Sequence, residues 1–344
     1  MISSVIKMNT MTQKIIIGLV SSLFLLGMTG CKEKATEISD STDYALMNYT
    51  LTINKQQYQF SNLTVTQLTR DEDQRVRYSV ISDIHGEVER IAPFIEELKK
   101  RDIEAILVPG DLVKNEELRY GRVDPQNDEQ ELEAVLKELG KSDLPVFVIP
   151  GNHETQKDWS RTVTTVRKEY PNIINMNQYR RFDGDDADIV SLSGYQVKES
   201  PGRKFIPGGG FWASPAMIDG LSALRAGLDD TVILLTHGPP ATGVNPGPGT
   251  LSSGEDVSDK YTAETMIKNN LSFAAVGHIH EAGGYAATLE GKVVREGEWS
   301  DRFVANFGTL ETWKNNNGKM YNGMAGILTI EGKEGKFEMI FLEK

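Results

Sequence analysis

The sequence predicts an α/β fold, and three observations carry this prediction. Short apolar segments that fit buried strands occupy residues 78–81, 105–108 and 146–149. The chain between them carries apolar side chains at helical spacing, so strands alternate with helices as they do around a parallel sheet. Each of these strands also ends in a short polar motif, and open α/β sheets bind ligands at the carboxyl ends of their strands.

The first 30 residues have the composition of a bacterial signal peptide. Lys7 and Lys14 precede an uncharged apolar run over residues 15–26, which is shorter than the run of about 20 residues that a membrane-spanning helix needs. Small residues then precede Cys31, in a pattern that resembles the lipobox of bacterial lipoproteins. We expect export, cleavage before Cys31 and lipid anchoring of this residue to a membrane of the cell envelope. An incidental thiol behind an uncleaved segment is the alternative.

Two further segments precede the predicted catalytic domain. Residues 31–43 are polar and rich in Ser, Thr, Glu and Asp, which is typical of a flexible tether that cannot bury a core. Residues 44–75 contain stretches that favour strands and predict a β-rich extension. The catalytic domain is expected over residues 76–344. Cys31 is the only cysteine, which excludes an intramolecular disulfide.

The catalytic domain is predicted to begin with three strands and two helices. Each helix has one apolar stripe for packing on a sheet. The stripes are Ile91, Phe94, Ile95 and Leu98 in the first helix, and Leu132, Val135, Leu136 and Leu139 in the second. Gly140 is expected to end the second helix. Later strands are expected at residues 232–235, 273–276, 303–307, 327–330 and 337–341, without a helix between the last two.

Polar motifs follow five of these strands. They are Asp83-Ile84-His85, Gly110-Asp111, Gly151-Asn152-His153, Thr236-His237 and Gly277-His278-Ile279-His280, and they contain all five histidines of the chain. Because carboxyl ends of neighbouring parallel strands meet at one edge of a sheet, we expect these side chains to lie close together. Carboxylate, imidazole and amide oxygen together suit Mn²⁺, Zn²⁺ or iron.

The number of candidate ligands exceeds the needs of one ion. The candidates are Asp83, His85, Asp111, Asn152, His237, His278 and His280. Two ions about 3.5–4 Å apart, bridged by one carboxylate, would clamp a phosphoryl oxygen and generate hydroxide at neutral pH. We therefore expect phosphoester hydrolysis, with two divalent or trivalent metal ions (Mn, Fe or Zn) as cofactors.

The motifs and their order resemble those of the calcineurin-like metallophosphoesterases over residues 77–308. The resemblance implies a four-layer αββα sandwich, in which two mixed β-sheets pack together and helices cover the outside. It also implies one ion held by Asp83, His85 and His280, a second held by Asn152, His237 and His278, and Asp111 as the bridge. His153 would bind the phosphate and protonate the leaving oxygen, a role that suits imidazoles in general.

The kind of ester is indicated by departures from other branches of this superfamily. Protein Ser/Thr phosphatases usually follow Gly-Asp with an Asp-Arg-Gly element, whereas Asp111 is followed here by Leu112-Val113-Lys114-Asn115. Little chain remains after Gly308 for the substrate domain of an exported 5′-nucleotidase. The segments around His237 and His280 look like those of small stand-alone phosphodiesterases. We expect a phosphodiesterase for a small-molecule, nucleotide or lipid-derived diester. A phosphomonoesterase, a nuclease or a non-catalytic metal-binding scaffold are the alternatives.

The charge of the chain bears on its partners. A formal net charge of −12 argues against nucleic acid, because proteins that bind it usually show clustered Lys and Arg. A phosphate substrate must therefore be attracted locally, by metal ions or by a small positive pocket.

Three other features have less specific interpretations. Aspartate-rich residues 183–188 do not fit a calcium-binding EF-hand loop, and we expect a solvated loop there. Residues 208–212 and 243–254 predict loops that either border a substrate pocket or form surface turns. Trp212, Trp299 and Trp313 are candidates for stacking on a base or sugar, but isolated aromatic residues favour the core.

Overall fold

The computed structural model describes residues 48–115, 125–196 and 210–342, with the backbone alone for residues 125–127. All of them belong to one unit, Tyr44–Lys344. The predicted signal peptide, the tether and Cys31 lie outside the described residues and remain predictions. Within the described residues, no helix is long and apolar enough to cross a membrane.

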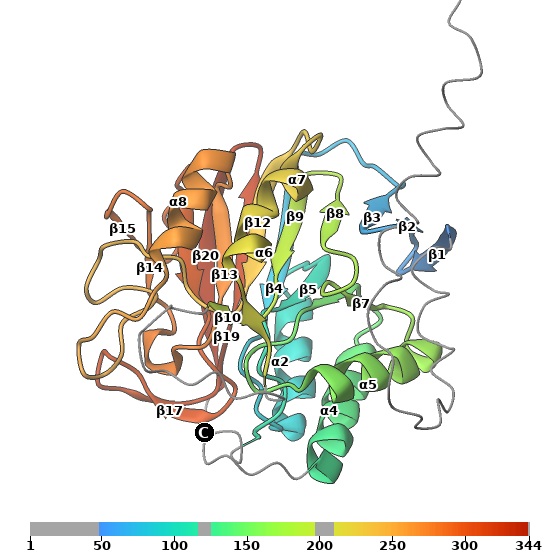
Figure 1. The fold of residues 1–344 in the computed structure, drawn as a ribbon, viewed down its shortest axis with the longest axis horizontal. Coiled ribbons are helices and arrows are strands. Elements are labelled where there is room, and N and C mark those ends of the chain that lie inside the picture. Colours follow the sequence, from blue (N-terminus) through green and yellow to red (C-terminus); the bar gives the residue numbers. More distant parts are fainter. Residues whose placement is uncertain (1–47, 116–124, 197–209, 343–344) are drawn as a thin grey trace, which may run out of the picture. The chain divides into compact units, whose positions relative to one another are not determined.

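Two mixed β-sheets form the centre of this unit (Figure 1). The larger sheet has the order β1 (Tyr49–Ile53), β2 (Gln56–Ser61), β3 (Thr64–Gln67), β8 (Arg181–Asp183), β9 (Ala187–Leu192), β12 (Thr231–Thr236), β13 (Phe273–Val276), β16 (Phe303–Asn306), β14 (Ala286–Ala287) and β15 (Val293–Val294). The smaller sheet has the order β20 (Glu334–Phe341), β19 (Met324–Glu331), β4 (Arg75–Val80), β5 (Ala105–Val108), β6 (Val146–Val148) and β7 (Ile173–Asn175). Two small pairs, β10 (Tyr195–Gln196) with β11 (Trp212–Ala213) and β17 (Thr312–Lys314) with β18 (Met320–Asn322), lie outside these sheets.

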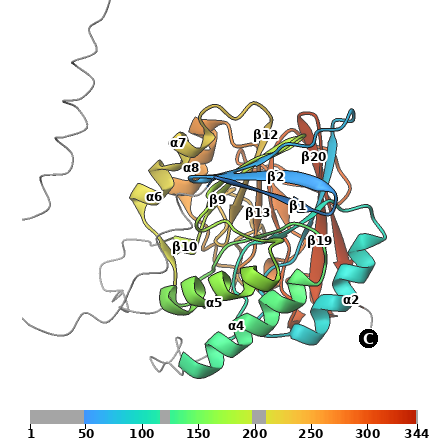
Figure 2. The same ribbon diagram turned by 90° about the vertical axis from the view of Figure 1, so that its right-hand side faces the viewer.

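Helices cover the outer face of each sheet. Apolar residues of α2 (Val88–Lys99), α4 (Pro125–Gly140) and α5 (Gln156–Glu169) share a core with the smaller sheet. Those of α6 (Pro215–Asp219), α7 (Leu221–Arg225) and α8 (Lys260–Asn269) share another core with the larger sheet. Figure 2 shows the two groups of helices on opposite sides of the sheets.

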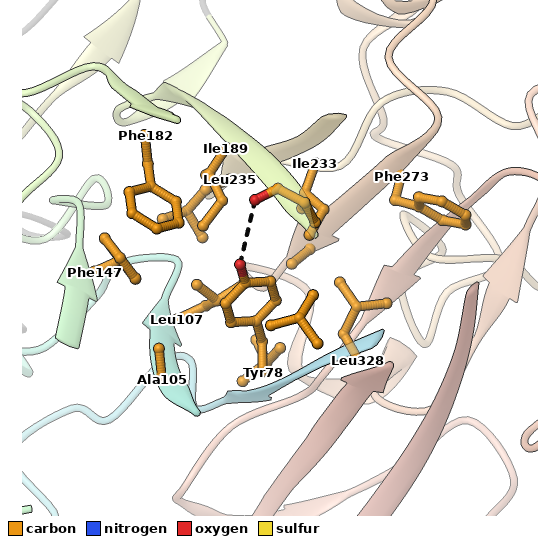
Figure 3. Packing of buried hydrophobic residues seen from close by; sticks show 14 of the residues in the cluster. Tyr78, Ala105, Leu107, Phe147, Phe182, Ile189, Ile233, Leu235, Phe273 and Leu328 are labelled. Atoms are coloured by element: carbon orange, nitrogen blue, oxygen red, sulfur yellow. Dashed lines mark hydrogen bonds between the residues drawn. The ribbon is translucent and has the colours of Figure 1, made fainter. Parts of the chain in front are cut away.

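Alternating side chains along the strands build these layers. In β5, Leu107 packs in the core between the sheets, whereas Ile106 packs against the helices. In β12, Ile233 packs between the sheets and Leu234 packs against the other helices. Figure 3 shows Leu107 and Ile233 in the central cluster, together with Phe182. The order helix, sheet, sheet, helix confirms the four-layer αββα sandwich that the family resemblance implied.

The elements predicted from apolar patterns are present. Strands β5 and β13 have the predicted bounds, whereas β4 begins earlier, at Arg75. Helix α4 ends at Gly140, and the predicted stripe of α2 is buried. The last two strands, β19 and β20, pair directly and antiparallel. Residues predicted as a β-rich extension contain β1, β2 and β3, which join the larger sheet through the parallel pairing of β3 with β8.

The prediction of a solvated loop at residues 183–188 is wrong. This segment connects the antiparallel strands β8 and β9, and Asp188 lies within β9 with none of its surface exposed. Its carboxylate accepts hydrogen bonds from the backbone N–H groups of Gly184 at 3.2 Å and Asp230 at 3.0 Å. These bonds favour its charged form, but burial outweighs them and raises the pKa of Asp188 to about 7.

Candidate metal centre

All five polar motifs converge at the carboxyl ends of strands from both sheets. Asp83 and His85 follow β4, Asp111 follows β5, Asn152 and His153 follow β6, His237 follows β12, and His278 and His280 follow β13. The expectation that these side chains lie close together is confirmed by two clusters whose ligand atoms lie within 4.8 Å of one another.

The first cluster consists of Asp83, His85 and His280. The Nε2 atom of His280 lies 3.2 Å from Oδ1 of Asp83 and 3.1 Å from Nε2 of His85. Oδ1 of Asp83 lies 3.8 Å from Nε2 of His85. All three donor atoms therefore surround one small volume, and Asp83 and His85 are buried.

The second cluster consists of Asp111, His237 and His278. Nε2 of His237 lies 3.1 Å from Oδ2 of Asp111 and 3.0 Å from Nδ1 of His278. The amide oxygen of Asn152 also lies 3.0 Å from Nε2 of His237. This grouping matches the ligand set that the resemblance implied for the second ion, and the bridging role of Asp111 remains a prediction.

The histidine tautomers fit a metal centre. Nδ1 of His85 lies 3.2 Å from the carbonyl oxygen of Val113, and Nδ1 of His237 lies 3.1 Å from that of Pro109. Because a carbonyl oxygen only accepts, these Nδ1 atoms donate a proton, and the Nε2 atoms face the centre as the potential metal-binding nitrogens. Nε2 of His85 lies 3.1 Å from Nε2 of His280, and a cation between the two nitrogens would be held by the lone pairs of both. The donor set therefore fits metal ions.

Charges in the two clusters are strongly coupled. Burial alone would raise the pKa of the Asp83 and Asp111 carboxyl groups. Contacts with His280 and His85 nevertheless hold the pKa of Asp83 well below its usual range, and contact with His237 does the same for Asp111. Burial lowers the pKa of His237, yet Asp111 and Asp83 raise it to about 9. Burial and the neighbouring His237 lower the pKa of His278 to about 3. The carboxylates are thus ready to bind metal, whereas binding at His237 must release a proton.

The backbone at four of these ligands is in the left-handed region, which residues other than glycine seldom adopt. The φ angles are 49° at Asp83, 46° at His85, 52° at Asp111 and 66° at His278. Hydrogen bonds between the strand-end loops hold this conformation, since the N–H of Asp83 donates to Gly110 O at 3.1 Å and that of His85 donates to Asp111 O at 3.1 Å. Such strain is maintained where the surrounding structure fixes a functional geometry.

The family described as calcineurin-like phosphoesterase matches residues 76–282. The chain belongs to this family. Its members use divalent metals, and the two clusters provide the corresponding ligand groups. The protein is therefore a metal-dependent phosphoesterase.

Two solved structures with TM-scores above 0.5 agree on the fold. One solved chain aligns over 78% of this chain and all of its own length, with 14% identity and a TM-score of 0.57. The protein TT1561 of Thermus thermophilus aligns over 78% of this chain and 99% of its own, with 15% identity and a TM-score of 0.54. A dimetal phosphatase from Danio rerio aligns over the same shares with 12% identity and a TM-score of 0.48. None of the curated proteins matches the chain.

His153 lies beside the second cluster of this phosphoesterase. Its Nδ1 donates to the carbonyl oxygen of Lys114 at 2.7 Å, so its Nε2 faces the centre, 3.7 Å from Oδ2 of Asp111. Its backbone N–H donates to Oδ1 of Asp111 at 2.9 Å. The side chain is 27% exposed, more than His85 or His237. His153 is therefore positioned to meet both solvent and a substrate at the centre.

Glu154 is a buried residue of the site that the sequence interpretation missed. One carboxylate oxygen accepts the N–H groups of Leu112 at 2.6 Å and Val113 at 3.1 Å, and the other accepts that of Gly151 at 2.6 Å. Burial and Asp111 raise its pKa to about 7. Glu154 thus ties the loop that carries Asp111 to the loop that carries Asn152. In the sequence, its position directly after His153 is the feature that could have indicated this role.

Asn306 has a similar role on the other side and was also missed. Its side-chain amide donates to the carbonyl oxygens of Gly277 at 3.1 Å, Ile279 at 3.1 Å and Pro248 at 2.9 Å. It therefore holds the segment that carries His278 and His280, and fastens residues 243–254 beside it. Gly277 permits this packing because a Cβ atom there would lie 2.0 Å from Oδ2 of Asp83.

Aromatic residues flank the two clusters. The ring of Tyr195 stacks on His278, with centroids 4.1 Å apart, and the ring of Trp313 lies edge-on to His280 at 4.6 Å. Trp212 pairs with Tyr195 through β10 and β11, next to Gly210, whose backbone is packed against Asn152. The described part of the loop at residues 208–212 thus borders the centre. Trp299 is 40% exposed and lies near Lys336, so of the two interpretations of this residue a place in the core does not apply.

Proposed function

We propose that this phosphoesterase is a phosphodiesterase with a binuclear metal centre. Asp83, His85 and His280 would hold one ion, Asn152, His237 and His278 the other, and Asp111 would bridge them. When bound, the ions polarise the phosphoryl group and lower the pKa of a water molecule that serves as nucleophile. The protein holds the ligands in place before the substrate arrives, through Glu154, Asn306 and the bonds between strand-end loops.

The observation that carries the diester preference is the charge around the clusters. Within the described residues, the carboxylates that act on the ligand histidines are Asp83, Asp111, Glu154 and Glu311. When ionised, they offset the four positive charges of two divalent ions. A centre whose positive charge is offset to this extent gains little from the second negative charge of a monoester, so it suits the single negative charge of a diester.

His153 supplies the proton for the leaving oxygen in this proposal. The bond from Nδ1 to Lys114 O fixes the ring, so that Nε2 is the atom that holds the transferable proton. General acids of this kind contribute about 10²- to 10⁴-fold to the rate. The His153→Ala variant should therefore lose most activity on diesters with poor alkoxide leaving groups, and little on diesters that release 4-nitrophenolate. An equal loss on both kinds of substrate would contradict this role.

The diester preference is tested with bis(4-nitrophenyl) phosphate and 4-nitrophenyl phosphate after reconstitution of metal-free protein with Mn²⁺. We expect kcat/KM to be at least about 10-fold higher for the diester, as one unit of charge mismatch at a partly screened site implies. A preference for the monoester would overturn the proposal and favour a phosphomonoesterase.

We also propose that the mature protein is exported and anchored through lipidated Cys31, which would place the site near the membrane surface. This proposal depends on the sequence of the first 31 residues. Mass spectrometry of the N-terminal peptide from membranes should show a lipidated cysteine, and Cys31→Ser should release the protein from the membrane fraction. An unmodified Cys31 within an uncleaved chain would refute it.

A further inference from the structure

His280 differs from His85, His237 and His153 in its outer contact. Nδ1 of His85, His237 and His153 each meets a backbone carbonyl oxygen. Nδ1 of His280 is buried and has no hydrogen-bond partner within the described part of the chain. The polar group that faces it is the carboxylate of Glu311, whose Oε2 lies 3.7 Å away. This distance is too long for a hydrogen bond and too short for water to pass between the two atoms.

The backbone of Glu311 is fixed with respect to another ligand of the same cluster. Its N–H donates to Oγ1 of Thr309 at 3.0 Å, and that hydroxyl donates to the carbonyl oxygen of Asp83 at 2.7 Å. The N–H of Leu310 donates to the same oxygen at 3.1 Å. The segment 309–311 therefore moves with Asp83, and the side chain of Glu311, which is 18% exposed, lies between this segment and His280.

The second oxygen of Glu311 connects to the other side of the centre. Its Oε1 lies 3.7 Å from Nζ of Lys114, whose backbone carbonyl accepts the hydrogen bond from His153. The Glu311 carboxylate therefore lies between the imidazole of His280 and the ammonium group of Lys114. Glu311 is thus placed to act on a ligand histidine while Lys114, in the loop that carries Asp111, contacts it from the opposite side.

We propose that Glu311 is a positioning residue of the metal centre, which accepts a hydrogen bond from Nδ1–H of His280 when the cluster of Asp83, His85 and His280 binds its ion. This inference rests on the proposed binuclear centre. A cation at Nε2 draws electron density from the ring and makes Nδ1–H a stronger donor. A movement of about 1 Å brings the carboxylate from 3.7 Å to the length of a charge-assisted bond. The bond fixes the tautomer and the orientation of His280, as outer carboxylates do for ligand histidines.

The test measures Mn²⁺ binding to metal-free protein by isothermal titration calorimetry and by electron paramagnetic resonance. The variants are Glu311→Gln, which keeps the shape and removes the charge, and Glu311→Ala. Glu334→Gln, at an exposed carboxylate in β20, is the matched control. We expect wild-type protein to bind two ions, and both Glu311 variants to weaken one of the two sites by about 10- to 100-fold, with the larger loss in Glu311→Ala.

The outcomes separate this inference from the proposed function. Wild-type affinity at both sites in the Glu311 variants overturns the inference and leaves the function intact, whereas failure of wild-type protein to bind two ions overturns the binuclear centre itself. Thermal unfolding without metal should be the same in wild type and Glu311→Gln, and a lower melting temperature would indicate a structural role instead. If the substitutions prevent folding, Glu311→Asp, which withdraws the carboxylate by one methylene, should still weaken the same site.

Discussion

Substitution of Glu154 provides a quantitative test of how the metal centre is supported. Its carboxylate is buried and accepts three backbone N–H groups, from Leu112, Val113 and Gly151. Glu154→Ala removes the acceptors of all three N–H groups in a place where water has little access. With about 1–2 kcal/mol for each unsatisfied donor, the variant should lose about 3–6 kcal/mol of the free energy of unfolding. For a chain of this size that loss corresponds to a decrease in Tm of about 5–10 °C.

The same substitution should affect catalysis, because Glu154 joins the loops of Asp111 and Asn152. A displacement of about 1 Å between groups of an active site costs on the order of 10²-fold in rate. Glu154→Gln should lose less stability than Glu154→Ala, because its amide oxygen can still accept the N–H groups on one side while its NH2 group faces the donor on the other. Glu138→Gln, which removes a surface ion pair with Lys141, is the control and should cost less than about 1 kcal/mol.

Urea and thermal unfolding of metal-free protein, followed by circular dichroism, measure the first effect, and diester hydrolysis measures the second. The expected order of stability is wild type, then Glu154→Gln, then Glu154→Ala. The reasoning is refuted if Glu154→Ala unfolds within about 1 kcal/mol of wild type, because the three N–H groups would then have other partners.

Three further predictions concern the fold around the site. Burial raises the pKa of Asp188 to about 7 from near 4 in the unfolded chain, so folding takes up a proton between these values and stability falls as pH rises from 5 to 7.5. In urea unfolding, Asp188→Asn should reduce this pH-dependent fall in the free energy of unfolding by about 1–3 kcal/mol. The same dependence on pH as in wild type would exclude a raised pKa of Asp188. Gly210→Ala would place a Cβ atom 2.4 Å from Asn152 O at a φ of 68°. We therefore expect the free energy of unfolding to fall by about 1–3 kcal/mol and calorimetry to show weaker metal binding. Wild-type values for both would contradict this packing. Phe182→Ala removes a ring packed on Phe147 between the sheets and should cost about 3–5 kcal/mol, which chemical denaturation can measure; a loss below about 1 kcal/mol would show that the sheets repack.

Much of the fold is predictable from the sequence because the central strands are buried on both faces. Such strands appear as uninterrupted apolar runs, as in residues 105–108 and 273–276, and their ends are marked by the polar motifs. Short edge strands carry a weaker signal. Strands β14 and β15 contain two residues each, and their pairing depends on contacts with β16 that no local pattern records.

The candidate ligands are predictable because their residue types and order are distinctive, whereas the groups that support them are not. Asn306 contacts three carbonyl oxygens from two distant segments, and only the folded chain brings these together. The choice of Nδ1 as the inward nitrogen of His278 follows from its backbone conformation and from stacking on Tyr195. Asp188 was misassigned because a run of aspartates suggests solvent, while its backbone partners lie on both sides of β9.

In the proposed function, the two clusters form one binuclear centre that hydrolyses phosphodiesters. Its most direct test measures metal content and bis(4-nitrophenyl) phosphate hydrolysis of the same preparations, for wild type and Asp111→Asn, after metal removal and reconstitution with Mn²⁺. We predict two ions and metal-dependent diester hydrolysis in wild type, and loss of at least one ion with a decrease in kcat of more than about 10²-fold in Asp111→Asn. Full activity in metal-free protein, or in Asp111→Asn with one ion bound, would contradict a binuclear catalytic centre.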